Sequence, residues 1–430
     1  MRNKYYHIAI FTIHLGKGGV QRVVTSLVKG FINCGLKVDI ILLNAKGDFL
    51  KQIPNQVRIF DLKARPNLFP YKFSEILRFL TKSQLKSPYL DFLWKCNLIL
   101  WKLAHYIRNK RISRIFWLND CALKLADYLH KEKPCALLSL TVDPNLISIR
   151  AKFYAQVPLR LIISERAAIM RFLVWNELTR IPLIRKDYPK ADKIIVISHG
   201  LANEMHQVLD IPREKIVVIY NPIAPEVFQK MNEPINHPWF EHEQPPVILA
   251  AGRFTKQKDF PNLLRAFAIV RRNRPARLLI LGDGEDRPLL EQLIKDLGIS
   301  EDVSLPGFTD NPYAFMKRAA VFVLSSIYEG LPNVLLEALA CGCPVVATDC
   351  PTGPREILDN GLYGRLVPVG DHEALAKAIL ETLDNPDFPA NREERIQRAL
   401  EFSLDAAVEK YLQVLLPEKF GNAARRQESP

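Results

Sequence analysis

The stretch from Tyr328 to Glu356, YEGLPNVLLEALACGCPVVATDCPTGPRE, constrains the fold more than any other part of the chain. A loop with Gly330 and Pro332 leads into a helix predicted over 333–340, because proline suits a first turn and the body is apolar. The residues CGCP end this helix, since glycine accepts the left-handed cap and proline cannot continue a helix. The apolar run at 345–347 predicts a short buried strand, and TGP predicts a further turn.

Two carboxylates bracket the predicted helix. Glu329 lies just before its start, and Glu337 lies eight residues later, inside it. The unpaired N–H groups at a helix start attract phosphate, and a carboxylate further along can accept hydrogen bonds from ribose hydroxyls. The pattern therefore fits a molecule with phosphates in the middle and sugars at both ends. A solvated glutamate before a helix and a second one on its exposed face is the alternative, and spacing alone leaves both open.

The same stretch resembles the Glu-x7-Glu motif of the retaining GT-B-fold glycosyltransferases, the group-one family (glycosyltransferase family 4). The match extends through EGLPNVLLEALACGCPVVATDCPTGPREI. The resemblance implies that Glu337 holds the ribose of a sugar nucleotide and that Glu329 contacts the donor sugar. It also implies that the loop and the helix start offer backbone groups to the donor, through Gly330, Leu331, Pro332, Asn333 and Val334.

Composition bounds the domain count and the compartment. A chain of 430 residues is too long for one ordinary core and suits two domains. The net charge of +13 predicts an anionic surface or polymer as a partner. Seven scattered cysteines argue against a disulfide framework and for a reducing compartment. Cys341, Cys343 and Cys350 form the only cluster, but no neighbouring histidine completes a zinc set, so no metal site is expected.

The sequence predicts no membrane span. The N-terminus has a basic start and an apolar run without a small-residue cleavage site, which favours a first strand. The most membrane-like segment, Tyr89 to Ile107, is interrupted by Asp91, Lys95 and Lys102, which disfavours a spanning helix. We expect a cytoplasmic protein that is soluble or peripheral at the cytoplasmic face of the membrane.

The first half alternates apolar strand runs with helical ones, which predicts a parallel sheet with right-handed crossovers. Strands are predicted at 7–13, 38–43, 136–140, 160–164 and 193–198, with a helix over 20–34. The loop GKGG at 16–19 is not the GxGxxG of dinucleotide-binding folds, which excludes a nicotinamide site. In the resembling family, the corresponding GGVQR loop borders the cleft, which implies that Gly18 and Gly19 bind the donor.

Residues 63–114 form a basic, aromatic insertion. Twelve Lys or Arg stand against two acids, Glu75 and Asp91, and aromatic residues are interleaved with them. This composition is typical of contact with an anionic membrane surface. An ordinary helical insertion that packs on the sheet is the alternative. Nucleic acid is not favoured, because no recognised binding motif accompanies the charge.

Two polar loops follow predicted strands, where open α/β sheets place ligands. They are TVDPN at 141–145 and SER at 164–166. Family members often carry a histidine or a short polar group here, facing the donor sugar. This chain has no histidine in that loop, so Glu165 is the catalytic candidate. The alternative is that Glu165 and Arg166 pair with each other or with solvent.

The second half opens with a strand predicted at 246–251, followed by GRFTKQKD. Arg253 and Lys258 can clamp a diphosphate, the arginine by its planar fork and the lysine as a point charge. A solvated basic turn is the alternative, but the loop closely matches the family's Gly-Arg…Lys-Asp motif, which implies a donor role for Gly252 as well. Further donor positions are implied in LLILGDG and in VSLPGF, which resembles the family's nucleobase-contacting turn: Gly282, Gly307 and Phe308.

The predicted fold class is α/β, with two Rossmann-like parallel-sheet domains that face a cleft in the GT-B arrangement. An acceptor-side domain covers 1–220, with the basic insertion at 63–114. A proline-rich linker covers 221–246, and the domain that binds the nucleotide sugar covers 247–404. A helix over 405–420 crosses back to the first domain, and residues 421–430 have the composition of a disordered tail.

The resemblance implies a retaining hexosyltransferase. The donor is a nucleotide diphosphate sugar, with uridine diphosphate favoured and guanosine diphosphate mannose next, and the acceptor is a hydroxyl of a glycan or a lipid-linked molecule. No two aspartates stand two apart, so the Asp-x-Asp metal clamp of the other main glycosyltransferase fold is absent, and neither metal nor cofactor is expected. Leaving-group charge must then fall on Arg253, Lys258 and the helix start. The candidate catalytic residues are Glu329, Arg253, Lys258 and Glu165.

Three other functions stay open. A glycoside hydrolase also uses paired carboxylates but has no need of the Arg/Lys clamp. A non-catalytic paralogue would bind a sugar nucleotide or an assembly partner, and the missing histidine keeps this alternative. An epimerase of the same fold would act on the sugar nucleotide without an acceptor.

Overall fold

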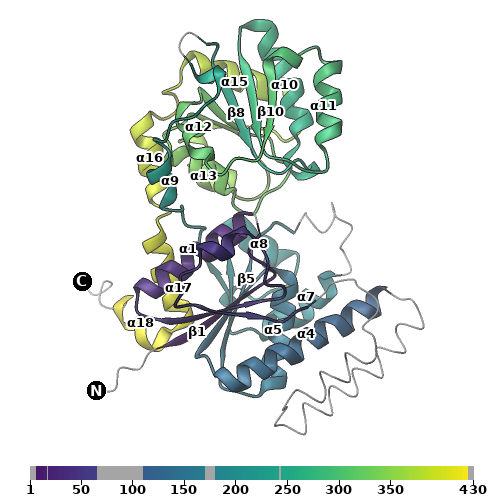
Figure 1. The fold of residues 1–430 in the computed structure, drawn as a ribbon, viewed down its shortest axis with the longest axis vertical. Helices are drawn as coiled ribbons and strands as arrows, with labels where there is room; N and C mark the ends of the chain where they lie inside the picture. The colour runs from purple at the N-terminus through teal and green to yellow at the C-terminus, as the bar shows by residue number, and fades with distance from the viewer. Residues whose placement is uncertain (1–5, 17, 65–109, 170–179, 242–243, 425–430) are drawn as a thin grey trace.

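The computed structural model describes residues 6–16, 18–64, 110–169, 180–241 and 244–424. They form two α/β domains, one above the other in Figure 1, and each is built on its own parallel sheet. The fold predicted from the sequence is thereby confirmed. Most of the basic insertion predicted at 63–114 lies outside the described residues, as does the apolar segment from Tyr89 to Ile107.

The first domain contains a seven-stranded parallel sheet in the order β3-β2-β1-β4-β5-β6-β7. Strand β1 pairs on one side with β2, where Ile8 lies opposite Val38, and on the other with β4, where Ile8 lies opposite Ala136. The central strands are buried because helices cover both faces of the sheet. The strands are β1 (His7–Thr12), β2 (Lys37–Leu42), β3 (Arg58–Asp61), β4 (Ala136–Leu140), β5 (Arg160–Glu165), β6 (Lys193–Val196) and β7 (Ile216–Val218).

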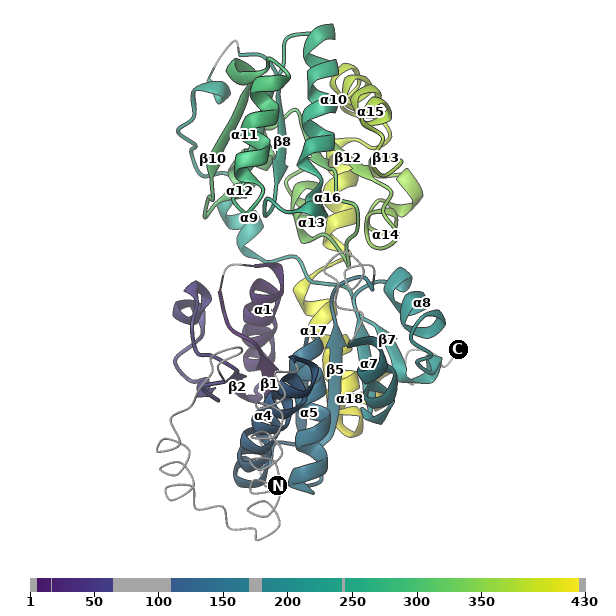
Figure 2. The same ribbon diagram turned by 90° about the vertical axis from the view of Figure 1, so that its right-hand side faces the viewer.

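Alternate residues of β1 face two different helix layers (Figure 2). Ala9 and Phe11 join the core beneath α4 and α5, whereas Ile8 and Ile10 join the core beneath α1. The helices of this domain are α1 (Gly19–Asn33), α4 (Lys110–Glu132), α5 (Val142–Ala155), α7 (Ile181–Asp187) and α8 (His199–Gln207).

The second domain contains a six-stranded parallel sheet in the order β10-β9-β8-β11-β12-β13. Its strands are β8 (Val247–Ala251), β9 (Arg277–Leu281), β10 (Val303–Gly307), β11 (Val321–Leu324), β12 (Val345–Thr348) and β13 (Arg365–Val367). Its helices are α10 (Phe260–Asn273), α11 (Arg287–Asp296), α12 (Pro312–Arg318), α13 (Asn333–Ala340), α14 (Pro354–Ile357), α15 (His372–Asp384) and α16 (Arg392–Leu400).

The proline-rich segment predicted as a linker is partly structured. It contains the short helix α9 (Glu226–Lys230), which contacts α12 and α13 of the second domain. The side chain of Asn311 donates to the backbone oxygen of Lys230 at 3.0 Å and so fixes the end of α9. Part of the segment therefore packs on the second domain rather than spanning freely between the two sheets.

The chain returns to the first domain at its C-terminal end (Figure 1). Helix α17 (Leu404–Leu415) packs on α1, where a side-chain carbon at Gly30 would come within 2.4 Å of Val408, so only glycine allows this approach. The rings of Phe31 and Tyr411 meet edge to face, with centroids 6.2 Å apart. Helix α18 (Pro417–Ala424) follows and extends into the stretch whose composition predicts a tail, while residues 425–430 lie outside the described part.

The chain crosses between the domains twice, near Ile223 and near Phe402, and these two crossings lie side by side. The backbone N–H of Ile223, on the first crossing, donates to the carbonyl of Phe402, on the second, at 2.8 Å. Close by, the carboxylate of Glu356 accepts hydrogen bonds from the backbone N–H groups of His199 and Gly200, at 2.7 and 2.8 Å. A side chain of the second domain thus caps the start of α8 in the first domain.

Membrane-spanning helices are absent from the described ranges, where no helix combines the length and the apolar character that crossing a bilayer requires.

Candidate active site

Helix α13 spans Asn333–Ala340, as the sequence predicts. It ends in a glycine cap at Gly342, whose φ is +74°, with hydrogen bonds from the N–H of Gly342 to Leu339 and from the N–H of Cys343 to Ala338. At the other end, no side chain among the described residues caps the helix. The start of α13 therefore keeps polar N–H groups available to an anion.

Glu329 and Lys258, both predicted as catalytic, form an ion pair. Nζ of Lys258 lies 2.6 Å from Oε1 of Glu329, and the glutamate is only 7% exposed. The hydroxyl of Ser326 donates to the same oxygen at 2.7 Å, and Nε2 of Gln257 lies 3.3 Å from Oε2. These contacts fix the carboxylate immediately before the start of α13.

The loop that carries Lys258 is held against the loop before α13. A single 3₁₀ turn, Lys256–Lys258, forms there, and the hydroxyl of Ser325 donates to the carbonyl of Lys258 at 2.6 Å. The N–H of Ile327 donates to the carbonyl of Gln257 at 2.8 Å. The stem of Lys258 passes over Gly252, where an added Cβ would lie 3.0 Å from Cε of the lysine. The loop of Lys258 and the loop before the Glu-x7-Glu helix are thus one packed unit.

Three predicted donor glycines lie in a row at the carboxyl ends of neighbouring strands. The N–H of Gly282 donates to the carbonyl of Gly307 at 2.8 Å. An added Cβ at Gly282 would come within 1.9 Å of the carbonyl oxygen of Gly252, so the two backbones touch. Gly282 and Gly307 also have φ values of +141° and +94°, which favour glycine. Phe308 follows directly, and 52% of its surface is exposed.

Glu337 lies inside α13 and is bound by the opposite domain. Nη1 of Arg22, on α1, donates to Oε1 at 2.6 Å. Oε2 is buried and has no hydrogen-bond partner among the described residues. The guanidinium lies over the ring of Tyr313, 5.7 Å from its centroid. The charge of Glu337 raises the pKa of Arg22 above its ordinary value, and this effect exceeds the opposing one of burial.

The glycine loop of the first domain meets the start of α13. An added Cβ at Gly19 would lie 3.2 Å from Nδ2 of Asn333, and both Gly18 and Gly19 are exposed. Oδ1 of Asn333 accepts a hydrogen bond from Asn221 at 2.7 Å. The structure therefore brings the first glycine loop together with the donor residues predicted on the second domain.

Arg253 is exposed and has no ion pair or hydrogen bond within the described part of the chain. Its charge acts on His14, at the end of β1: burial first, and then the charges of Lys46 and Arg253, lower the pKa of that histidine. Nδ1 of His14 accepts a hydrogen bond from the N–H of Gly16 at 3.0 Å. Arg253 thus has no partner among the described residues, and its charge lowers the pKa of an imidazole in the first domain.

Glu165 lies at the end of β5 and is 3% exposed. Its carboxylate accepts hydrogen bonds from the hydroxyl of Tyr188 and from the N–H of Arg166, both at 3.0 Å. Arg166 in turn donates to Tyr411 at 3.2 Å and to Asn221. These bonds connect Glu165 to the interior of the first domain and not to Lys258 or Glu329. Its catalytic role stays a prediction.

The three cysteines Cys341, Cys343 and Cys350 are buried. Burial raises the pKa of Cys343 to about 12, and it also raises the pKa of Cys341 and of Cys350 well above the ordinary thiol value. No group of three or more His, Cys, Asp or Glu side chains in the described ranges is arranged to hold a metal ion.

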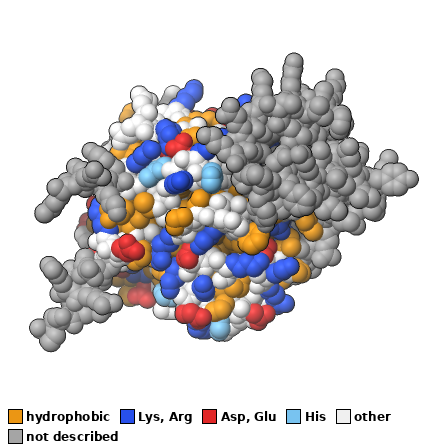
Figure 3. Space-filling model, turned by 90° about the horizontal axis from the view of Figure 1, so that it is seen from below, with side chains coloured by type: hydrophobic (Ala, Val, Ile, Leu, Met, Phe, Trp, Pro, Cys, Tyr) orange, Lys and Arg blue, Asp and Glu red, His pale blue; other side chains and the backbone are white. Residues whose placement is uncertain are grey.

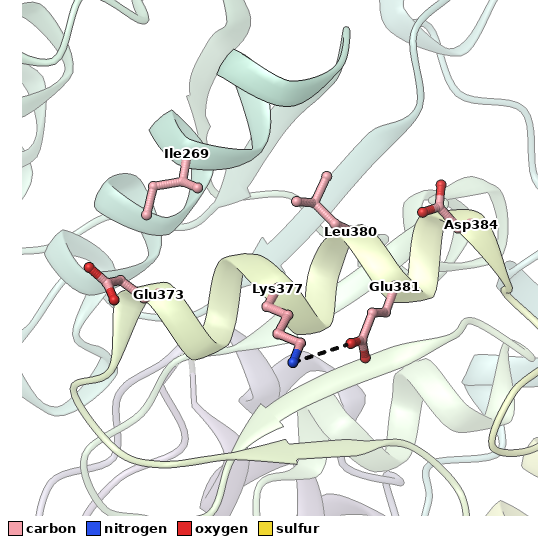
Figure 4. Close-up of a pocket in the computed structure, with 6 residues that line it drawn as sticks. All are labelled: Ile269, Glu373, Lys377, Leu380, Glu381 and Asp384. Carbon is pink, nitrogen blue, oxygen red and sulfur yellow. Dashed lines mark ion pairs between the residues drawn. The ribbon is translucent and has the colours of Figure 1, made fainter.

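A shallow hollow lies between α10 and α15, on the part of the second domain farthest from the junction (Figures 1 and 4). Its lining residues are Ile269, Glu373, Lys377, Leu380, Glu381 and Asp384. Two of its carboxylates are already paired, Glu381 with Arg365 at 2.9 Å and Asp384 with Arg274 at 2.7 Å. None of the predicted site residues lines it.

The structure adds residues that the sequence did not single out: Arg22, Asn221, Tyr313 and His14. Arg22 is the final residue of the GGVQR loop, so the motif contained it, but only the glycines were assigned a role. His14 lies two residues after the end of the first strand, where parallel sheets place ligand-binding groups. Nothing in the local sequence indicates that Asn221 contacts Asn333 or that Tyr313 contacts Arg22.

The chain has two parallel-sheet domains joined by two crossings, and a Lys–Glu pair precedes a helix that carries a second glutamate. These features define a GT-B glycosyltransferase. The family model for glycosyl transferases group 1 matches residues 232–399, and the model for glycosyltransferase family 4 matches residues 164–227. The chain belongs to the group-one glycosyltransferases, family 4, and is a transferase.

Relatives agree with this assignment, and a solved structure shares the fold. The chain is 31% identical over 383 residues to the N-acetylgalactosamine-N,N'-diacetylbacillosaminyl-diphospho-undecaprenol 4-alpha-N-acetylgalactosaminyltransferase of Campylobacter jejuni, covering 88% of this chain and 90% of that one. It is 38% identical to the lipopolysaccharide core biosynthesis glycosyltransferase LpsE of Rhizobium meliloti, covering 40% of this chain and 49% of that one. Anabaena HepE in complex with UDP-glucose shares the fold, with a TM-score of 0.67 at 18% identity over 96% and 100% of the two chains.

Proposed function

We propose that this protein transfers a hexosyl group, with retention and without a metal ion or cofactor, from a nucleotide diphosphate sugar to a hydroxyl acceptor. A uridine diphosphate sugar is the favoured donor. The observation that carries the proposal is the Lys258–Glu329 pair, 2.6 Å across, beside the uncapped start of α13. It combines a fixed cation and polar N–H groups for a diphosphate with a fixed carboxylate for the sugar.

Stabilisation of the leaving group falls on Arg253, Lys258 and the start of α13. As the bond from the sugar to the diphosphate breaks, negative charge grows on the oxygen of the leaving diphosphate. Preorganised cations and N–H groups aimed at that oxygen lower the barrier without a metal ion. Because Lys258 is held by Glu329, its ammonium is positioned before the donor arrives. Exposed Arg253 supplies a planar fork suited to phosphate oxygens.

Glu337 anchors the ribose in this proposal. A buried carboxylate oxygen without a partner is unfavourable, and Oε2 of Glu337 is such an atom within the described residues. A neutral ribose hydroxyl can satisfy such an oxygen once it becomes accessible. The nucleobase would then lie toward Gly307 and Phe308, which follow the glycine row.

The acceptor is proposed as a glycan or a lipid-linked molecule in envelope polysaccharide or glycolipid synthesis. The name of the Campylobacter relative specifies an acceptor linked to diphospho-undecaprenol, and the Rhizobium relative acts in lipopolysaccharide core synthesis. The solved HepE structure contains UDP-glucose. These names support the acceptor class and the uridine donor for this chain.

A lipid-linked acceptor places the protein at the cytoplasmic face of a membrane. The end of the first domain seen in Figure 3 presents many Lys and Arg side chains among hydrophobic ones, with fewer carboxylates. Cations suit anionic headgroups, and the sequence of residues 63–114 is itself rich in Lys and Arg. We expect the protein to sediment with anionic vesicles, but not with zwitterionic ones, at low salt. Failure to sediment with either would remove this part of the proposal.

A thermal-shift screen of sugar nucleotides would identify the donor, because a ligand that binds only the folded state raises the stability of the protein. Product NMR then tests the chemistry, and an α-linked donor should give an α-linked product. A β-linked product would overturn retention. Binding without turnover would indicate a non-catalytic paralogue, and a changed donor sugar in the absence of acceptor would indicate an epimerase. Hydrolysis of a glycoside without nucleotide binding would indicate a hydrolase.

A further inference from the structure

Helix α1 of the first domain supplies the partner of the proposed ribose anchor. Oε1 of Glu337 accepts from Nη1 of Arg22 at 2.6 Å. The glutamate side chain is 4% exposed and that of the arginine 28%, so Arg22 lies on the solvent side of the pair. Tyr313 backs the guanidinium, 5.7 Å below it. Arg22 therefore covers the carboxylate.

The second oxygen of this carboxylate is closed off as well. Oε2 of Glu337 is buried and unpartnered within the described residues. A ribose hydroxyl must approach to about 2.7–2.8 Å to form a hydrogen bond, and a buried atom leaves no room for one. One oxygen of Glu337 is thus paired with Arg22, and the other is buried.

We propose that Arg22 takes the place of the ribose at Glu337 in the ligand-free enzyme and sets the donor affinity by competing with it. The inference rests on the proposed function, in which Glu337 binds the ribose. A nucleotide must break the ion pair before both carboxylate oxygens can accept the 2′- and 3′-hydroxyls. The apparent affinity is then the intrinsic affinity multiplied by the fraction of molecules in which the pair is open.

The chain offers a matched control on the same helix. Lys29, also on α1, pairs with Glu226 of α9 at 2.8 Å. This pair likewise joins the first domain to the second-domain side of the junction, but it does not touch Glu337. Removing Lys29 loosens the junction without freeing the ribose anchor, and this separates the two effects.

The test compares UDP with 2′,3′-dideoxy-UDP on purified full-length protein, by isothermal titration calorimetry. The quantity of interest is the ratio of the two affinities within each variant, because loss of the Arg22 charge affects both diphosphates alike. Dideoxy-UDP has no ribose hydroxyls to offer Glu337 and binds with the ion pair intact, whereas UDP gains its hydroxyl contacts with Glu337 only when the pair breaks. We expect Arg22→Gln to raise the ratio in favour of UDP by roughly three- to tenfold over wild type. Lys29→Gln should leave the ratio unchanged, and Arg22→Lys should give an intermediate ratio.

An unchanged or lower ratio in Arg22→Gln overturns the inference, because it would mean that Arg22 is neutral or supports ribose binding. An equal rise in Lys29→Gln also overturns it, since general loosening would then suffice. Should Arg22→Gln fail to fold in a thermal melt, the ratio of Arg22→Lys decides. Failure of the proposed function looks different, because neither wild type nor any variant would then bind UDP or a UDP-sugar.

Discussion

Glu356 of the second domain caps helix α8 of the first, with its carboxylate 2.8 Å from the N–H of Gly200. The hydroxyl of Tyr220, on the first crossing, donates to the same carboxylate at 3.1 Å. A negative charge at a helix start is favoured by the helix dipole as well as by the hydrogen bonds. One side chain therefore joins both domains and a crossing.

Glu356→Ala should destabilise the protein by about 1–2 kcal/mol, as the loss of a helix cap does. For domains of this size, we expect a fall in melting temperature of about 2–8 °C, measured by calorimetry. Glu373→Ala, in the exposed first turn of α15, is the control and should change the melting temperature much less. Equal effects of the two variants would show that the contact between the domains contributes nothing.

Lys258→Ala should lower kcat by about 10²–10³-fold, because it removes a preorganised cation from the leaving group. Arg253→Ala should act in the same direction. The neighbouring Lys256→Ala is the control, since Lys256 is exposed in the same turn, and it should retain most of the activity. Steady-state kinetics with saturating donor measure the effect. Turnover near wild type in both Lys258→Ala and Arg253→Ala would remove these residues from the site.

Gly330→Ala should reduce activity while leaving each domain folded. A Cβ at this position would lie 2.5 Å from the carbonyl oxygen of Arg166, which belongs to the first domain. Since this oxygen belongs to the backbone, the domains must separate to make room. Gly298→Ala is the control, because no described atom lies within 4 Å of the added carbon, although φ there is +66°. Circular dichroism checks the fold, and donor kinetics should show a loss of kcat/KM only in Gly330→Ala.

Stability should fall in acid partly through Asp39, which is fully buried. Burial alone would raise its pKa, but hydrogen bonds from His7, Arg58 and Tyr128 outweigh burial and hold the pKa well below its usual range. A lowered folded pKa gives stability that is present above the unfolded value of about 3.9 and is lost as pH falls through the folded one. The contribution is on the order of 2–3 kcal/mol.

Asp39→Asn should therefore be less stable than wild type at pH 7, with a smaller further loss between about pH 5 and pH 2. Urea unfolding at several pH values measures both quantities. Arg58 keeps a partner in Glu132 in this variant, so its charge is not left unpaired. Parallel pH profiles of Asp39→Asn and wild type would contradict the assignment.

Much of the fold could be predicted because it is local. Strand β4 and helix α13 have the bounds that the sequence predicts, since apolar runs and glycine or proline punctuation mark both. Strands β3, β7 and β13 are not predicted by the sequence. They contain only three or four residues, and β3 and β13 carry Arg58 and Arg365 and lack an apolar run. Helix α9 was missed because it has five residues and lies in a proline-rich stretch.

The site was predictable where a motif is contiguous and unpredictable where it is not. The Glu-x7-Glu stretch and the Gly-Arg…Lys-Asp loop identified Glu329 and Lys258, which the structure pairs. Arg22 and Glu337 are 315 residues apart, and their ion pair depends on how two domains meet. A local sequence pattern contains no such information, and for this reason the pairing of Glu337 with Arg22 is visible only in the structure.

The paired crossings also determine how the two domains can move. Because the N–H of Ile223 bonds to the carbonyl of Phe402, the two connections act as a single seam and not as two independent tethers. Two domains joined along one line of contacts rotate about that line as about a hinge. Glu356 lies close to this hinge, whereas Arg22 and Glu337 face each other across the junction between the two domains. A small rotation about the hinge is therefore enough to separate or join the pair.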